Sequence, residues 1–121
     1  MNQQQPPPEG GTPPGAQAAS ATHPDNALEE GERAALERLI GHAKSDTIQS
    51  PRVADFLLAW WDAASCGGFD LTKLWGLDDA IAADAVTVFA LVARVNLYPD
   101  RLGYEADFKA IARAWRPALA D

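Results

Sequence analysis

Apolar residues recur with the period of an α-helix in four segments of this chain. The segments cover about residues 30–44, 51–65, 79–95 and 104–114. A shorter run at residues 70–75 predicts one further helical turn, which ends at Gly76. Each long segment has an apolar face and the connections are short. The pattern therefore predicts an all-α fold, a compact bundle of four main helices plus one short helical turn.

Typical start and stop residues frame these predicted helices. Ser50 is placed to cap the second helix, and Pro51 fits its first helical position. Gly67 follows the end of the same helix, where glycine is common. Asp70 and Asp78 are the predicted caps of the short turn and of the third helix.

The second helix has the broadest apolar surface, an arc of roughly 200° at about 100° per residue. A helix this apolar is expected at the centre of the bundle, contacted on more than one side. The aromatic residues expected in the core are Phe56, Trp60, Phe89, Phe108 and Trp115.

The first 25 residues differ in composition from the rest of the chain. They contain a Gln run, are rich in Pro and Gly, and show no periodic apolar positions. Such a segment cannot bury enough apolar surface to offset its chain entropy. Residues 1–25 are therefore predicted to be a disordered tail, and residues 26–121 the helical domain.

Charge and cysteine content limit the possible partners and the possible cellular compartment. The chain has 121 residues and a formal net charge of −7, and its ten Lys and Arg are spread singly. Nucleic-acid binders usually carry a basic stripe, so this pattern argues against nucleic-acid binding. The apolar run at residues 85–93 is shorter than the roughly 20 residues of a membrane span. The single cysteine, Cys66, suits a reducing compartment, and a cytoplasmic location without membrane association is expected.

Motifs for catalysis and cofactor binding are missing from the sequence. It contains no phosphate-binding loop, no HExxH, no CxxC pair and no GxSxG. Its two histidines offer little material for a metal site. Cys66 lies at the C-terminal end of a helix, where the helix dipole disfavours a thiolate. We therefore expect a non-enzymatic protein with no catalytic residue, no metal and no cofactor.

Two groups of residues are candidates for binding a partner. Asp55 and Asp62 lie seven residues apart on one helix face. Paired carboxylates can do acid–base work or hold a cation, but a solvated strip with Arg52 paired to Asp55 is the preferred interpretation. The second group is the connection after that helix, which contains Phe69, Asp70, Lys73 and Trp75. Its aromatic residues either anchor a partner or plug the open end of the bundle, and the plug is preferred.

Leu91 is the one large apolar residue in the polar strip of the third helix, between Asp84 and Arg94. Single exposed leucines are common and need no function. Together with Leu58, at the rim of the second helix's apolar arc, Leu91 is also a candidate for a self-association patch and thus for a homodimer.

Three segments carry a family resemblance: ERAALERLIGHA at Glu32–Ala43, SPRVADFLLAWWDAASCGGFDLTKLWGLD at Ser50–Asp78, and WRPAL at Trp115–Leu119. The sequence from Glu32 to Ala118 resembles a family of small uncharacterised proteins carried on proteobacterial integrative and conjugative elements. SCGGFDL is its most specific portion. The resemblance implies a context, that of an accessory protein of a mobile genetic element, and it implies no catalytic residue or cofactor.

Three functions are open at this point. The preferred one is a non-enzymatic accessory or protein-interaction module of a mobile genetic element, with an unidentified protein partner. One alternative is an acidic inhibitor of host defence that imitates the charge of nucleic acid. The other is a helix-turn-helix-like DNA-binding regulator, which would use Lys109, Arg113 and Arg116 of the last helix.

Overall fold

The structure is a computed structural model that describes residues 28–120. The domain is built from four long helices, α2 (Glu30–Ala43), α3 (Ser50–Cys66), α4 (Asp79–Val95) and α5 (Glu105–Trp115). Its connections and C-terminal end contain three short elements, the 3-10 turns η2 (Leu71–Gly76) and η3 (Pro99–Leu102) and the helix α6 (Pro117–Ala120). The predicted all-α bundle is confirmed, since the described residues contain no strand. The tail predicted for residues 1–25 lies outside the described residues.

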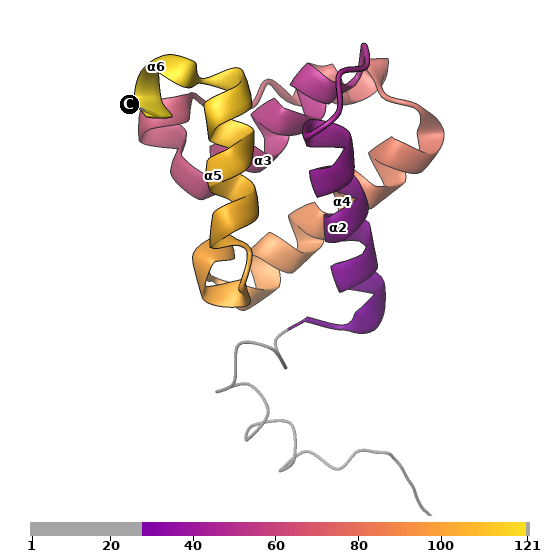
Figure 1. The fold of residues 1–121 in the computed structure, drawn as a ribbon. Coiled ribbons are helices and arrows are strands. Elements are labelled where there is room, and N and C mark those ends of the chain that lie inside the picture. Colours follow the sequence, from indigo (N-terminus) through magenta and orange to yellow (C-terminus); the bar gives the residue numbers. More distant parts are fainter. Residues whose placement is uncertain (1–27, 121) are drawn as a thin grey trace, which may run out of the picture.

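Helix α2, and not α3, is the central helix of the bundle. It packs against α3, α4 and α5, and Figure 1 shows α2 and α5 side by side with α3 and α4 crossing behind them. Helix α3 is contacted by α2 and by α5, in line with the expected contact on more than one side, but it is not central because no helix of residues 28–120 covers part of its apolar arc. Phe56 and Trp60 on that part of α3 are only half-buried.

Helix α4 has the predicted bounds but a different buried face. Phe89, expected in the core, is 59% exposed, whereas Leu91, expected in a polar strip, is fully buried. Leu58 is fully buried as well. The self-association patch that the sequence suggested for Leu58 and Leu91 is therefore excluded, because neither side chain reaches the surface.

Two ion pairs join α4 to α2 on either side of Leu91. Arg38 Nε donates to Asp84 Oδ2 at 2.8 Å. Arg94, ten residues after Asp84 on α4, is paired with Glu32. Asp84 and Arg94, which flank Leu91 along α4, thus pair with opposite charges on α2. Leu91 packs against α2 between these two ion pairs.

Gln49, not Ser50, is the N-cap residue of α3. Ser50 is the buried first residue of the helix, and its hydroxyl accepts a hydrogen bond from the Thr47 amide at 2.9 Å. Asp78 is the N-cap residue of α4, as predicted, but its carboxylate makes no capping bond. Its Oδ2 accepts from the side-chain Nε2 of Gln49 at 2.8 Å, while the side-chain Oε1 of Gln49 accepts from the Asp78 backbone N–H at 2.6 Å. Gln49 therefore ties the start of α3 to the start of α4.

Aromatic side chains close the core between α3 and α5. Phe108 is fully buried, and its ring meets Trp60 edge to face, with centroids 5.8 Å apart. Trp60 donates from its indole N–H to the Leu97 carbonyl at 3.0 Å. Trp115 donates to the Ala43 carbonyl at 2.7 Å, which satisfies one of the carbonyls left open at the C-terminal end of α2.

Candidate functional site

Asp55 is bound by two cations and does not lie in a solvated strip. Lys73 Nζ in η2 donates to its Oδ2 at 2.7 Å, and Arg116 Nη2, just after α5, donates to its Oδ1 at 2.6 Å. Burial by itself would raise the pKa of the Asp55 carboxyl. The hydrogen bonds and positive charges of Arg116 and Lys73 outweigh it and hold this pKa below its usual value. Asp55 is thus the junction at which η2 and the C-terminal segment meet α3.

Arg52 does not pair with Asp55, contrary to the expected contact across one helical turn. Its Nη1 donates to the Lys73 carbonyl oxygen at 3.2 Å, because η2 folds back over α3 and brings this oxygen within reach. The guanidinium also packs on Gly76, where an added Cβ would lie 2.7 Å from Arg52 Cζ. Arg52 therefore holds η2 in place next to Asp55.

Asp62 lies at a break inside α3. Its backbone leaves the helical conformation, with φ of −163° and ψ of 76°, and its Oδ1 accepts from the Ser65 N–H at 3.2 Å. This is the bond of an N-cap residue, and it restarts the helix for one more turn. Among the described residues no hydrogen bond or ion pair joins Asp62 to Asp55, so the structure does not bring the two predicted carboxylates together.

The segment between α3 and α4 places its two aromatic residues in different environments, Phe69 before η2 and Trp75 within it. Phe69 packs edge to face on Phe56 of α3, with ring centroids 5.3 Å apart, whereas Trp75 is 84% exposed. Asp70 caps η2, since its Oδ1 accepts from the Thr72 N–H at 2.9 Å. This bond and a second one from the Thr72 hydroxyl lower the pKa of Asp70.

Cys66 is buried at the end of α3, and its carbonyl accepts from Arg116 Nε at 3.0 Å. Burial raises the pKa of the Cys66 thiol, the charge of Asp62 raises it further, and Arg116 opposes both effects. A groove of about 430 Å³ adjoins the cysteine, lined in part by Trp61, Lys109 and Arg113. The raised pKa lowers the fraction of the nucleophilic thiolate.

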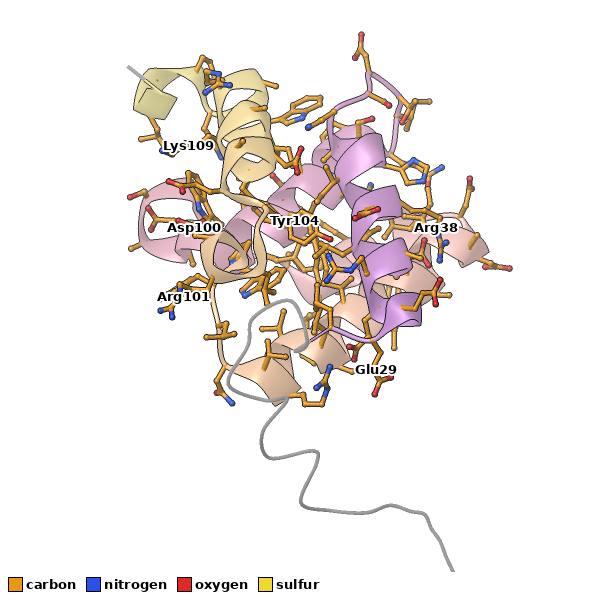
Figure 2. All side chains as sticks on the ribbon, turned by 60° about the horizontal axis from the view of Figure 1, so that its bottom comes forward. Glu29, Arg38, Asp100, Arg101, Tyr104 and Lys109 are labelled. Carbon is orange, nitrogen blue, oxygen red and sulfur yellow. The ribbon has the colours of Figure 1, made fainter. Side chains whose placement is uncertain are left out.

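A second groove, of about 770 Å³, also borders Trp61 and is lined in part by Trp60, Tyr98 and Arg101. Trp61 donates from its indole N–H to Asp100 Oδ1 at 2.9 Å. Figure 2 shows Lys109, Asp100 and Arg101 along one edge of the domain, with Arg38 on the opposite side. Positive and negative charges alternate along this edge, so it forms no basic stripe.

The outward side of α4 is apolar, although it faces solvent. We call it the α4 outer face, and its members are Ala83, Val86, Phe89, Ala90 and Ala93, all exposed. Val86 and Phe89 are 61% and 59% exposed. The one charged residue between Ala80 and Ala93 is Asp84, which points to α2 and pairs with Arg38. The outer face is therefore uncharged over almost its whole length.

An apolar groove of about 220 Å³ adjoins the outer face between α3 and α4. We call it the α3–α4 groove, and its lining consists of Phe56, Ala59, Trp60, Phe69, Leu71, Phe89 and Val92. Phe89 belongs to both features and joins them into one surface. Leu71 extends this surface onto η2, where it is 61% exposed.

Comparison with protein families assigns the helical domain to a family. Residues 33–116 match a family of unknown function (DUF7673). The chain belongs to this family. Comparison with curated proteins and with solved structures gave no match. The DUF7673 match runs from the first turn of α2 to Arg116. It contains α2 except for its first three residues, the whole of α3, α4 and α5, and both ends of the Arg116–Asp55 ion pair.

Sequence reasoning missed Val86 and Phe89 as exposed residues of the DUF7673 domain. The signal was nevertheless present, because α4 carries uncharged residues on nearly every side. A helix that is apolar all round needs partners on more than one side, and α4 packs mainly against α2. None of the helices between residues 28 and 120 is long and apolar enough to cross a membrane.

Proposed function

We propose that this DUF7673 domain is a non-enzymatic protein-interaction module. It binds an apolar helix of a protein through the α4 outer face and the α3–α4 groove. The observation that supports this function is the continuous apolar surface around Phe89, where Val86 and Leu71 are exposed as well. Contiguous exposed apolar patches are typical of interaction surfaces.

The chemistry of the surface fits a helix as its occupant. An amphipathic helix binds such a surface by placing side chains from successive turns into an apolar groove. Phe89 and Trp60 offer aromatic contact area at the groove, and aromatic residues often dominate binding energy. Because the outer face carries no charge, the side of the partner helix that meets it is apolar too.

The environment of the other candidate residues supports a non-enzymatic role. The Asp55 carboxylate is paired with both Lys73 and Arg116, and burial raises the pKa of the Cys66 thiol. A general base needs a carboxylate that is free to accept a proton, and a nucleophile needs a thiolate. Both groups are poorly suited to these roles.

We further propose that the module serves a mobile genetic element as an accessory protein. The support is the resemblance of residues 32–118 to proteins of integrative and conjugative elements. Deletion of the gene from such an element in its proteobacterial host tests this role. We expect element transfer to fall and to be restored by the wild-type chain and by the Ile48→Glu variant, but not by Val86→Glu. Unchanged transfer after deletion would overturn the accessory role.

The interaction itself is tested with a photoreactive phenylalanine at position 89 of the full chain, expressed in the same host. The same photoreactive residue at position 48 is the matched control, because Ile48 is 93% exposed but lies outside the surface. We expect a protein cross-linked only from position 89. Its purified form must then bind the wild-type and Ile48→Glu chains and lose at least tenfold in affinity for Val86→Glu. Equal binding by all three chains would refute the proposed surface.

The two alternative functions are less well supported. Nucleic-acid mimicry needs unpaired carboxylates gathered on one side, but Asp84, Asp107 and Glu105 each form an ion pair with a cation. The DNA-binding alternative needs free cations on α5. Arg116 is held by Asp55 and Lys109 by Glu105, which leaves Arg113 without an ion pair to the described residues. Salt-sensitive binding to duplex DNA would favour the DNA-binding alternative.

A further inference from the structure

Five of the eight exposed residues of α4 lie at a regular spacing along the helix. Asp79, Ala83, Val86, Ala90 and Ala93 are separated by four, three, four and three residues, and all are exposed. A spacing that averages 3.5 residues is that of a helix whose seam pairs with a second helix over several turns. The small alanines allow close approach, and Val86 supplies a branched side chain at the middle of the seam.

The charges at the two ends of this seam are opposite. Asp79, in the first turn of α4, is exposed at one end. Arg94, in the last turn, lies at the other end, and its side chain is 47% exposed even though it pairs with Glu32. A second α4 that runs antiparallel places each Asp79 near an Arg94 of the other copy. A parallel second α4 would place like charges, and like ends of the two helix dipoles, side by side.

We infer that the partner of the α4 outer face is a second copy of this chain, bound antiparallel through α4 in a two-fold symmetric dimer. This inference rests on the proposed function and names its partner. A single register satisfies the whole seam, because the alignment that joins Asp79 to Arg94 also joins Ala83 of one copy to Ala90 of the other. In this alignment Val86 of each copy lies next to the two-fold axis. A two-fold interface uses the same patch on both copies, as this self-complementary seam allows.

The net charge of the chain also favours this surface over acidic surfaces for self-association. Two copies with a formal net charge of −7 each repel one another. The α4 outer face is a surface on which they can meet without bringing carboxylates together, because Asp84 is turned inward to Arg38.

The surface is small for a dimer interface. The seam from Asp79 to Ala93 is roughly 20 Å long and about 10 Å wide. This footprint is smaller than the about 800 Å² per partner of a standard interface. We therefore expect a weak dimer that dissociates on dilution.

Sedimentation equilibrium of the full chain over a wide range of concentration tests the dimer. The apparent mass of the wild-type chain is expected to rise from monomer to dimer as the concentration increases. Val86→Glu should shift the Kd upward by at least tenfold, with an unchanged circular dichroism spectrum and melting temperature. Ile48→Glu makes the same change at an exposed site off the seam and should dimerise like the wild-type chain.

Disulfide trapping in a Cys66→Ser background tests the orientation. An Ala83→Cys chain mixed with an Ala90→Cys chain should form a mixed disulfide, whereas either chain alone should form little. Disulfides within each single-variant sample, at the expense of the mixed one, would show a parallel pair and overturn the antiparallel arrangement.

The outcomes also separate this inference from the proposed function. A monomer at all concentrations, together with cross-linking from position 89 to a different protein, overturns the self-association and leaves the interaction module standing. If the chain is a monomer and no protein is found whose binding depends on Val86, both the dimer and the interaction module are overturned. A dimer that Val86→Glu leaves intact overturns the α4 seam as its interface.

Discussion

Arg116 and Asp55, which are 61 residues apart in the chain, are joined by a hydrogen bond of 2.6 Å from Nη2 to Oδ1. Arg116 also donates to the Cys66 carbonyl at 3.0 Å. One guanidinium thus connects the segment after α5 to the middle and to the end of α3. Because Lys73 occupies the second oxygen of Asp55, a single carboxylate fixes two distant segments on α3.

Replacing Asp55 by Asn should therefore destabilise the domain. The substitution leaves two cations without their carboxylate, and hydrogen bonds to charged groups contribute about 1.5–3 kcal/mol each when present. We expect the free energy of unfolding in urea to fall by about 2 kcal/mol. Asp46→Asn is the control, because Asp46 is exposed and surface changes stay within about 0.5 kcal/mol. Equal effects of the two substitutions would contradict the junction role of Asp55.

The same carboxylate predicts a loss of stability in acid. The folded-state pKa of Asp55 lies below its value in the unfolded chain, which is about 3.9. Its contribution to stability is therefore complete above about pH 4 and is lost as the pH falls through the lower folded-state pKa. Urea unfolding at a series of pH values should show the wild-type and Asp55→Asn curves converging below about pH 4. A constant difference down to pH 2 would disprove this linkage.

The orientation of α4 predicts unequal effects for two large apolar residues two positions apart. Leu91 is fully buried and Phe89 is 59% exposed. Leu91→Ala should lower the free energy of unfolding by about 2–5 kcal/mol, and Phe89→Ala by less than about 1 kcal/mol. Thermal unfolding of dilute protein measures both. The reverse order would mean that α4 is rotated toward the face that the sequence first suggested.

The thiol of Cys66 should react slowly in the folded protein. Burial and the raised pKa both reduce the amount of accessible thiolate. With a disulfide reagent at pH 8 we expect a rate at least tenfold below that of the same chain in urea. A native thiol as reactive as the unfolded one would show that the end of α3 opens readily.

Trp75 should dominate the fluorescence that a small quencher can reach. It is 84% exposed, whereas Trp60, Trp61 and Trp115 are partly buried and donate their indole N–H to protein oxygens. Trp75→Phe should lower the acrylamide quenching constant and leave the melting temperature unchanged. Trp115→Phe, the matched control, should lower the melting temperature instead, because it removes the bond to the end of α2.

Much of the helical architecture could be predicted because its signals are local. The predicted bounds of the third helix, Asp79–Val95, agree with those observed, and Gly67 follows α3 as expected. The start of α3 was misassigned by one residue because Ser50 uses its hydroxyl on Thr47. The break at Asp62 was also missed, because a helix pattern of apolar residues continues through it.

The candidate site was predicted only in part. Asp55 and Lys73 were singled out, but their contact, and the role of Arg116, depend on how η2 and the end of α5 fold back on α3. Phe69 and Trp75 were treated as one group, and the structure separates them into a packed ring and an exposed one. Periodicity gives the residues that share a face of a helix, but it does not give the neighbour of that face.

Four amphipathic helices follow from local signals in the sequence, because helix propensity, capping and apolar periodicity act within a few residues. The buried side of α4 depends instead on contacts with the other helices. That helix is apolar on nearly all sides, so its own pattern allows more than one orientation. The packing of α4 against α2 selects one of them, in which Arg38 and Glu32 on α2 pair with Asp84 and Arg94. Leu91 is thereby placed in the core, and Val86 and Phe89 remain at the surface.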